Sequence, residues 1–81
     1  EMVVRRENEA WRVTGARVER AVAMTDMNNE EAVRRLQRRL ISMGVEKMLE
    51  RSGAEPGDEV RIGETAFDFE PEGTATPEDV R

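Results

Sequence analysis

Residues 59–69 constrain the fold most strongly, because apolar and charged side chains alternate along them and a glycine divides the run. Alternation with a period of two places the apolar side chains on one face of a β-strand. Gly63-Glu64 lies between the two arms and fits a type II′ turn, in which glycine takes the first central position. The segment therefore predicts a hairpin with one apolar face, in which Val60 lies opposite Phe67.

A second hairpin is expected at the start of the chain. Residues 2–6 and 9–13 are apolar at alternate positions, and Glu7-Asn8 lies between them. Asparagine tolerates the left-handed backbone conformation that a tight turn requires. With a two-residue turn at Glu7-Asn8, Val4 lies opposite Trp11 and both side chains face the same side. Each hairpin therefore has one apolar face that needs a cover.

Three short amphipathic helices between the hairpins would supply that cover. Apolar residues recur at helical spacing over residues 16–24, 28–43 and 45–53. The order of elements is then β-β-α-α-α-β-β. This order predicts an α+β fold, in which two β-hairpins form a mostly antiparallel four-stranded sheet covered on one face by three short helices. The order of the strands across the sheet does not follow from the pattern.

The ends of the expected helices carry residues that helix termini favour. Asn28 is expected to be the N-cap of the second helix, with Glu31 completing a capping box. Gly44 is expected to end or kink that helix, and Gly53 suits the C-terminal cap of the third.

The composition allows one small domain with a thin core. Only 37% of the 81 residues are hydrophobic, with one Trp and two Phe. We expect the core to form around Trp11, Phe67 and Phe69. We expect residues 1–70 to fold as the domain and residues 71–81 to form a disordered acidic tail, because the tail has little apolar surface to bury.

The residue types also restrict the chemistry and the compartment. The chain has no Cys and no His, which excludes disulfides and thiolate metal sites and removes the commonest general base. No apolar run is long enough to span a membrane, and the formal net charge of -5 differs from the basic balance of a dedicated nucleic-acid binder. We expect a cytoplasmic, monomeric domain without a membrane contact.

Two groups of acidic residues suggest metal binding or catalysis, but both are explained better by local structure. The groups are Asp26, Glu30 and Glu31, and Glu55, Asp58 and Glu59. The first lacks the alternating oxygen ligands of a Ca²⁺ loop, and helix capping accounts for it better. The second lacks a nucleophile and a base, which favours solvated turn residues. We therefore expect no catalytic, metal-binding or cofactor-binding residue.

Four arginines on the second helix are the candidate partner contacts. They are Arg34, Arg35, Arg38 and Arg39. On a helical wheel they span about 140°, opposite the apolar stripe, so four guanidinium groups would be available to phosphates of RNA. The alternative is a solvated face, in which Glu30 and Glu31 pair with arginines four residues later. Because no aromatic residue is interleaved for base stacking, we favour the solvated face.

An ordered series of short motifs runs along residues 2–69. The series includes Trp11-x-Val13-x-Gly15, Thr25-Asp26-Met27-x-Asn29, Met43-Gly44-Val45-Glu46 and Gly57-Asp58-x-Val60-x-Ile62-Gly63. It resembles the C-terminal domain found in a subset of the Obg family of bacterial GTPases.

The resemblance implies a parent protein with a glycine-rich N-terminal domain and a central GTPase domain that binds GTP and Mg²⁺. It also implies contact with the large ribosomal subunit during its assembly and a link to the guanine-nucleotide stress response. The phosphate-binding sequence G-x-x-x-x-G-K-[ST] is absent here, and no Gly-Lys pair occurs. We therefore expect a non-catalytic regulatory or docking domain, whose partners are the parent's other domains and either the large ribosomal subunit or other proteins. Two alternatives stay open: an independent RNA-binding module that uses the arginine face, and a sensor that holds a nucleotide between helices and sheet.

Overall fold

The structure is a computed structural model, and it describes residues 1–71. The strands are β1 (Val3–Glu7), β2 (Ala10–Thr14), β3 (Glu59–Ile62) and β4 (Thr65–Asp68). The helices are α1 (Ala16–Ala23), α2 (Glu30–Ser42) and α3 (Val45–Ser52). The predicted order β-β-α-α-α-β-β is thereby confirmed. The tail expected over residues 71–81 lies, apart from Pro71, outside the described residues.

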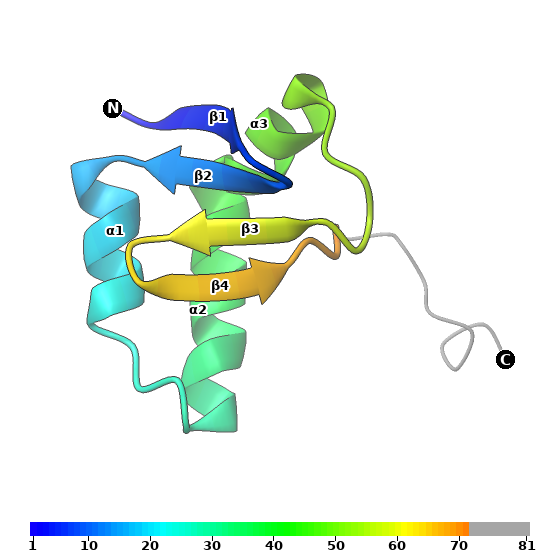
Figure 1. The fold of residues 1–81 in the computed structure, drawn as a ribbon. Coiled ribbons are helices and arrows are strands. Elements are labelled where there is room, and N and C mark those ends of the chain that lie inside the picture. The colour runs from blue at the N-terminus through cyan, green and yellow to red at the C-terminus, as the bar shows by residue number, and fades with distance from the viewer. Residues whose placement is uncertain (72–81) are drawn as a thin grey trace, which may run out of the picture.

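The four strands form one sheet in the order β1-β2-β3-β4. Both hairpins are antiparallel, and the central strands β2 and β3 are parallel. A parallel pair needs a long crossover, and the three helices between β2 and β3 provide it. Figure 1 shows these helices behind the sheet, so the face of the sheet toward the viewer is left without a helical layer. The predicted α+β fold with a mostly antiparallel sheet is confirmed.

The second hairpin has the predicted register, with Val60 opposite Phe67. Gly63 has φ 61°, and the only non-glycine residue of 1–71 with positive φ is Asn8, in agreement with a type II′ turn at Gly63-Glu64.

The predicted register of the first hairpin is wrong. Val4 lies opposite Val13, and Trp11 lies opposite Arg6. The turn is at Asn8-Glu9, and Asn8 takes its first central position with φ 57°. Asparagine tolerates this left-handed conformation better than glutamate does. The shift changes each cross-strand partner by two residues, so every side chain stays on its predicted face.

The N-cap of α2 is also one residue later than predicted. Asn29, in place of Asn28, caps the helix: its Oδ1 accepts hydrogen bonds from the backbone N–H groups of Glu31 and Ala32, at 2.9 and 3.1 Å. The Asn28 N–H donates to Asp26 Oδ1 at 3.0 Å in the turn before the helix. The two positions are adjacent asparagines, so the residue type alone did not distinguish them. The predicted glycines at the ends of α2 and α3 are confirmed as left-handed residues.

The core lies between the helices and the covered face of the sheet. Leu36 of α2 and Ile62 of β3 are among its most deeply buried side chains. Trp11 and Phe69 belong to it as predicted, with 7% and 5% of their surface exposed. Phe67 is only half-buried and packs against the margin of this core. Its strand, β4, is at the edge of the sheet, so the helices cover it less completely.

A polar contact closes one end of the core. The indole Nε1 of Trp11 donates a hydrogen bond to Asp58 Oδ2 at 3.0 Å, and the Glu55 N–H donates to the same oxygen at 2.9 Å. The Asp58 carbonyl accepts from the Phe69 N–H at 2.7 Å. The guanidinium of Arg6 lies 4.6 Å from the centre of the indole ring. Asp58, expected to be a solvated turn residue, instead ties β2 to the loop before β3 and to the end of β4.

These donors set the ionisation of Asp58 and predict an acid-sensitive stability. The Glu55 N–H, and after it the Trp11 indole, hold the pKa of Asp58 below its ordinary value. The folded state therefore binds this proton less tightly than the unfolded chain. The resulting stability is present above pH about 4, the range of an unfolded Asp, and is lost as the pH falls through the lowered pKa. We expect the free energy of unfolding, measured in urea by Trp11 fluorescence, to fall between pH 5 and pH 3.

The variant Asp58→Asn isolates this contribution. It should be less stable than the wild type at pH 7 and should show a smaller further loss on acidification. Glu64→Gln is the matched control, because the Glu64 side chain is exposed and makes no ion pair or hydrogen bond within residues 1–71. Equal acid slopes for wild type and Asp58→Asn would contradict the assignment.

Candidate interaction surfaces

The four candidate arginines lie on the outward side of α2. Arg34, Arg35, Arg38 and Arg39 are all exposed. The structure keeps them together as two adjacent rows, since residues four apart lie on one line of a helix. Leu36, on the opposite side of the helix, is 2% exposed. Both interpretations of the stripe, an RNA contact and a solvated face, require this exposure.

The expected carboxylate partners of the stripe do not engage it. On the described residues, Glu7 pairs with Arg12 and Arg61, and Glu59 pairs with Arg61, and none of these ion pairs includes an arginine of the stripe. Glu30 and Glu31 are thus not within ion-pair distance of Arg34 and Arg35. Exposed ends of long side chains gain little from such contacts, because water screens the attraction and ordering the side chains is unfavourable. The stripe consequently presents four guanidinium groups without a paired carboxylate in the described part of the chain.

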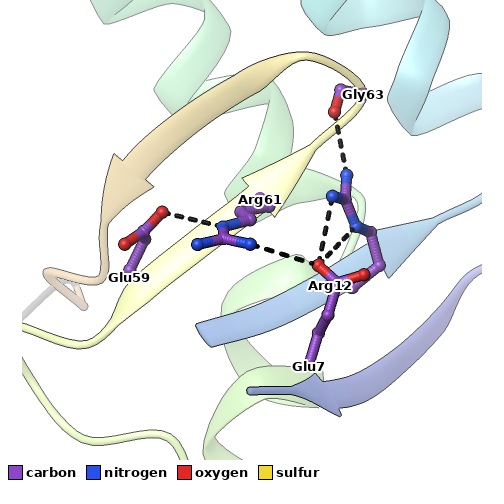
Figure 2. Close-up of polar contacts among 5 residues, drawn as sticks. All are labelled: Glu7, Arg12, Glu59, Arg61 and Gly63. Atoms are coloured by element: carbon purple, nitrogen blue, oxygen red, sulfur yellow. Dashed lines mark hydrogen bonds and ion pairs between the residues drawn. The ribbon is translucent and has the colours of Figure 1, made fainter. Parts of the chain in front are cut away.

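The face of the sheet that no helix covers carries a charge network that the sequence did not predict. Figure 2 shows Glu7 Oε1 between two arginines, 3.1 Å from Arg12 Nη2 and 3.5 Å from Arg61 Nη1. Arg61 Nε lies 2.8 Å from Glu59 Oε2, and Arg12 Nη1 donates to the Gly63 carbonyl at 2.8 Å. The network thereby joins β1, β2, β3 and the turn before β4.

The charged groups of the network stabilise one another's ionised forms. The hydrogen bond from Arg12, with the charges of Arg12 and Arg61, holds the pKa of Glu7 below its ordinary value. The hydrogen bond and charge of Glu59, with a contribution from Glu7, raise the pKa of Arg61 above its ordinary value. Two carboxylates balance two guanidinium groups, so the network holds the strands in register and offers little net charge to an anion.

A groove separates the helices from the edge of the sheet at β4. It has a volume of about 450 Å³. Apolar side chains form much of its wall, among them Leu40, Ile41 and Phe67. Carboxylates also line it, and these are Glu46, Asp68 and Glu70. No lysine or arginine is among the described residues that line it.

A second hollow of about 620 Å³ lies near the N-terminus. It is lined by Met2 and Gly15 together with Arg17, Arg39 and Met43. Arg39 of the arginine stripe therefore borders this hollow, whereas Gln37 and Ile41 of the same helix border the groove beside β4. The two sides of α2 thus face different surroundings.

Within residues 1–71, no group of three or more His, Cys, Asp or Glu residues is arranged to hold a metal ion. Over the same residues, no helix has both the length and the apolar character required to cross a membrane.

The fold and its surfaces define a small α+β domain built on a four-stranded mixed sheet. A family described as a domain of unknown function, DUF1967, matches residues 2–69. The chain belongs to this family.

Curated relatives connect the domain to larger proteins. The chain is 55% identical over 65 residues to the GTPase Obg of Heliobacterium modesticaldum, which covers 80% of the chain and 15% of that protein. It is 48% identical over 67 residues to the GTPase Obg of Desulforudis audaxviator, covering 83% and 16%. It is 50% identical over 66 residues to the GTPase Obg of Rubrobacter xylanophilus, covering 82% and 16%. The resemblance to the Obg family is confirmed, and the chain spans 15–16% of the length of these relatives.

Proposed function

We propose that this chain is a non-catalytic regulatory and docking domain of a cytoplasmic, Obg-like GTP-binding protein. In this proposal the parent protein binds GTP and Mg²⁺ in a separate domain and acts in the assembly of the large ribosomal subunit and in the stress response. The domain contacts either the parent's other domains or the ribosomal subunit.

One observation carries the proposal. The chain is 44–55% identical to proteins named GTPase Obg, yet it has no Gly-Lys pair and therefore no phosphate-binding loop of the G-x-x-x-x-G-K-[ST] type. Backbone N–H groups and a lysine are needed in such a loop to hold the phosphates of the nucleotide. In this proposal, other segments of the parent hydrolyse GTP, and this domain binds partners or regulates the parent.

The test compares the parent protein with a version that ends before Glu1. We expect both proteins to hydrolyse GTP at similar rates alone. We expect the shortened protein to differ in its binding to large ribosomal subunits or in the hydrolysis rate that the subunits stimulate. Identical behaviour in the presence and absence of subunits, with equal growth of cells that carry either version, would exclude regulation by this domain.

A second candidate function, RNA binding by α2, is favoured by the unpaired exposure of the arginine stripe. It predicts that Arg35→Glu with Arg38→Glu weakens the binding of single-stranded RNA. If each arginine contacts one phosphate, the slope of log K against log salt becomes shallower by about 1.4, at about 0.7 per contact.

The matched control for this variant is Lys47→Glu with Arg51→Glu. These residues are exposed on α3, and the substitutions change the net charge by the same amount away from the stripe. Salt-dependent binding measured by fluorescence anisotropy separates the two variants. Equal weakening by both variants would mean that only the net charge matters and not the position of the stripe. The absence of any RNA affinity at low salt would exclude this function.

A further inference from the structure

The outer edge of β4 is open to another strand. Within residues 1–71, β4 has only one neighbour, β3. In a two-residue hairpin the residues that flank the turn exchange backbone hydrogen bonds, so Thr65 and Phe67 bond to β3. The N–H and C=O groups of Ala66 and Asp68 therefore point away from β3. None of the backbone hydrogen bonds outside the sheet in residues 1–71 uses these groups.

The groove lies directly beside this edge. Phe67 contributes to both, since it belongs to β4 and lines the groove. Ile41, across from it on α2, is 38% exposed although it is a large aliphatic residue, and Leu40 is half-buried. A strand paired with β4 would place alternate side chains toward the helices, over this apolar wall. The edge and the groove thus form one continuous surface.

The charge of the groove selects the chemistry of an incoming strand. Asp68 and Glu70 are exposed carboxylates that line it, and no basic side chain among the described lining residues balances them. Lysine or arginine residues of a partner would be attracted to them. The chain's own residues 72–81 carry three acidic residues and one arginine, so their sequence is less complementary to the groove.

We propose that β4 binds an extended segment of a protein partner by strand addition, with an aliphatic side chain of the segment in the groove and flanking lysine or arginine residues beside Asp68 and Glu70. This inference rests on the proposed docking function and names the class of partner, a segment in which basic and aliphatic residues alternate. Backbone hydrogen bonds to Ala66 and Asp68 provide the affinity. The groove and the carboxylates determine which segments bind.

The test uses the ¹⁵N-labelled 81-residue chain and a blocked peptide of sequence Lys-Thr-Lys-Ile-Lys-Thr-Lys. We expect saturable changes of amide chemical shifts in β4 and around Leu40 and Ile41. Three control peptides isolate the components of the interaction: one has Glu in place of every Lys, one has Thr in place of Ile, and one is N-methylated at alternate residues. Each should bind at least about tenfold more weakly, which corresponds to 1.4 kcal/mol.

Two variants of the chain check the location. Asp68→Lys should weaken binding of the Lys peptide by about tenfold, whereas Glu64→Lys, the same charge change in the β3–β4 turn, should leave it within about twofold. Ala66→Pro should retain the fold, because the N–H that it removes faces away from β3, and should abolish binding. If Ala66→Pro fails to fold, Asp68→Lys decides alone.

Several outcomes would overturn strand addition. These are the absence of shift changes at millimolar peptide, equal binding of the N-methylated peptide, and shift changes confined to the arginine stripe. Shifts in β4 that depend on protein concentration without peptide would assign the edge to a second copy of the chain. If the peptide does not bind but loss of the domain still alters the parent's response to ribosomal subunits, strand addition fails and docking stands. If the peptide binds but loss of the domain does not alter the parent's response to ribosomal subunits, strand addition stands and the proposed docking function fails.

Discussion

Replacement of Trp11 by alanine is expected to lower the free energy of unfolding by about 4 kcal/mol. Trp11 is 7% exposed on the central strand β2 and packs within the core. The substitution removes the indole from the core, together with its hydrogen bond to Asp58 and its contact with Arg6. A domain of this size has a total stability on the order of 4–10 kcal/mol. The loss is therefore a large fraction of the total, and the midpoint of urea unfolding, measured by circular dichroism, should shift to a much lower urea concentration.

Trp11→Phe is the matched control for the polar part of this effect. It keeps an aromatic ring in the core and removes the Nε1–H that donates to Asp58 Oδ2. The loss of that hydrogen bond is expected to cost about 1 kcal/mol, in addition to a small packing change. A loss below about 2 kcal/mol in Trp11→Ala would contradict the central role of the indole in this core.

Local patterns predicted the hairpins and helices because each depends on residues close in the sequence. The apolar face of β3 and β4 follows from alternation around Gly63, and that hairpin formed in the predicted register. The first hairpin could not be placed to the residue. Turns at Glu7-Asn8 and at Asn8-Glu9 put the same side chains on the apolar face, so the hydrophobic pattern does not distinguish them.

The order of strands and two of the surfaces depend on residues distant in the sequence. The parallel pairing of β2 with β3 brings Glu7 and Arg12 beside Arg61. Without that pairing, nothing in the sequence indicates that these charges meet. The groove likewise requires α2 to pack beside the edge strand β4. The arginine stripe was visible in advance because its four residues lie on two turns of one helix.

Helix α2 has one buried side and exposed sides, and this arrangement determines which of its side chains a partner can contact. Leu36 is the buried anchor of this helix, and the arginines and Ile41 lie around it on exposed positions. One helix therefore contributes a basic stripe to one side and an apolar wall to the groove on another. Both surfaces depend on the same anchor holding α2 against the sheet.

Leu36→Ala is therefore expected to lower the free energy of unfolding by about 3 kcal/mol, because it leaves a cavity under the centre of α2, where Leu36 is only 2% exposed. Ile41→Ala on the same helix removes a similar aliphatic side chain that is already 38% exposed, and it should cost about 1 kcal/mol or less. Urea unfolding followed by Trp11 fluorescence compares the two variants. Equal losses would mean that α2 is anchored through its groove side, and the groove beside β4 would then be part of the core rather than a site for a partner.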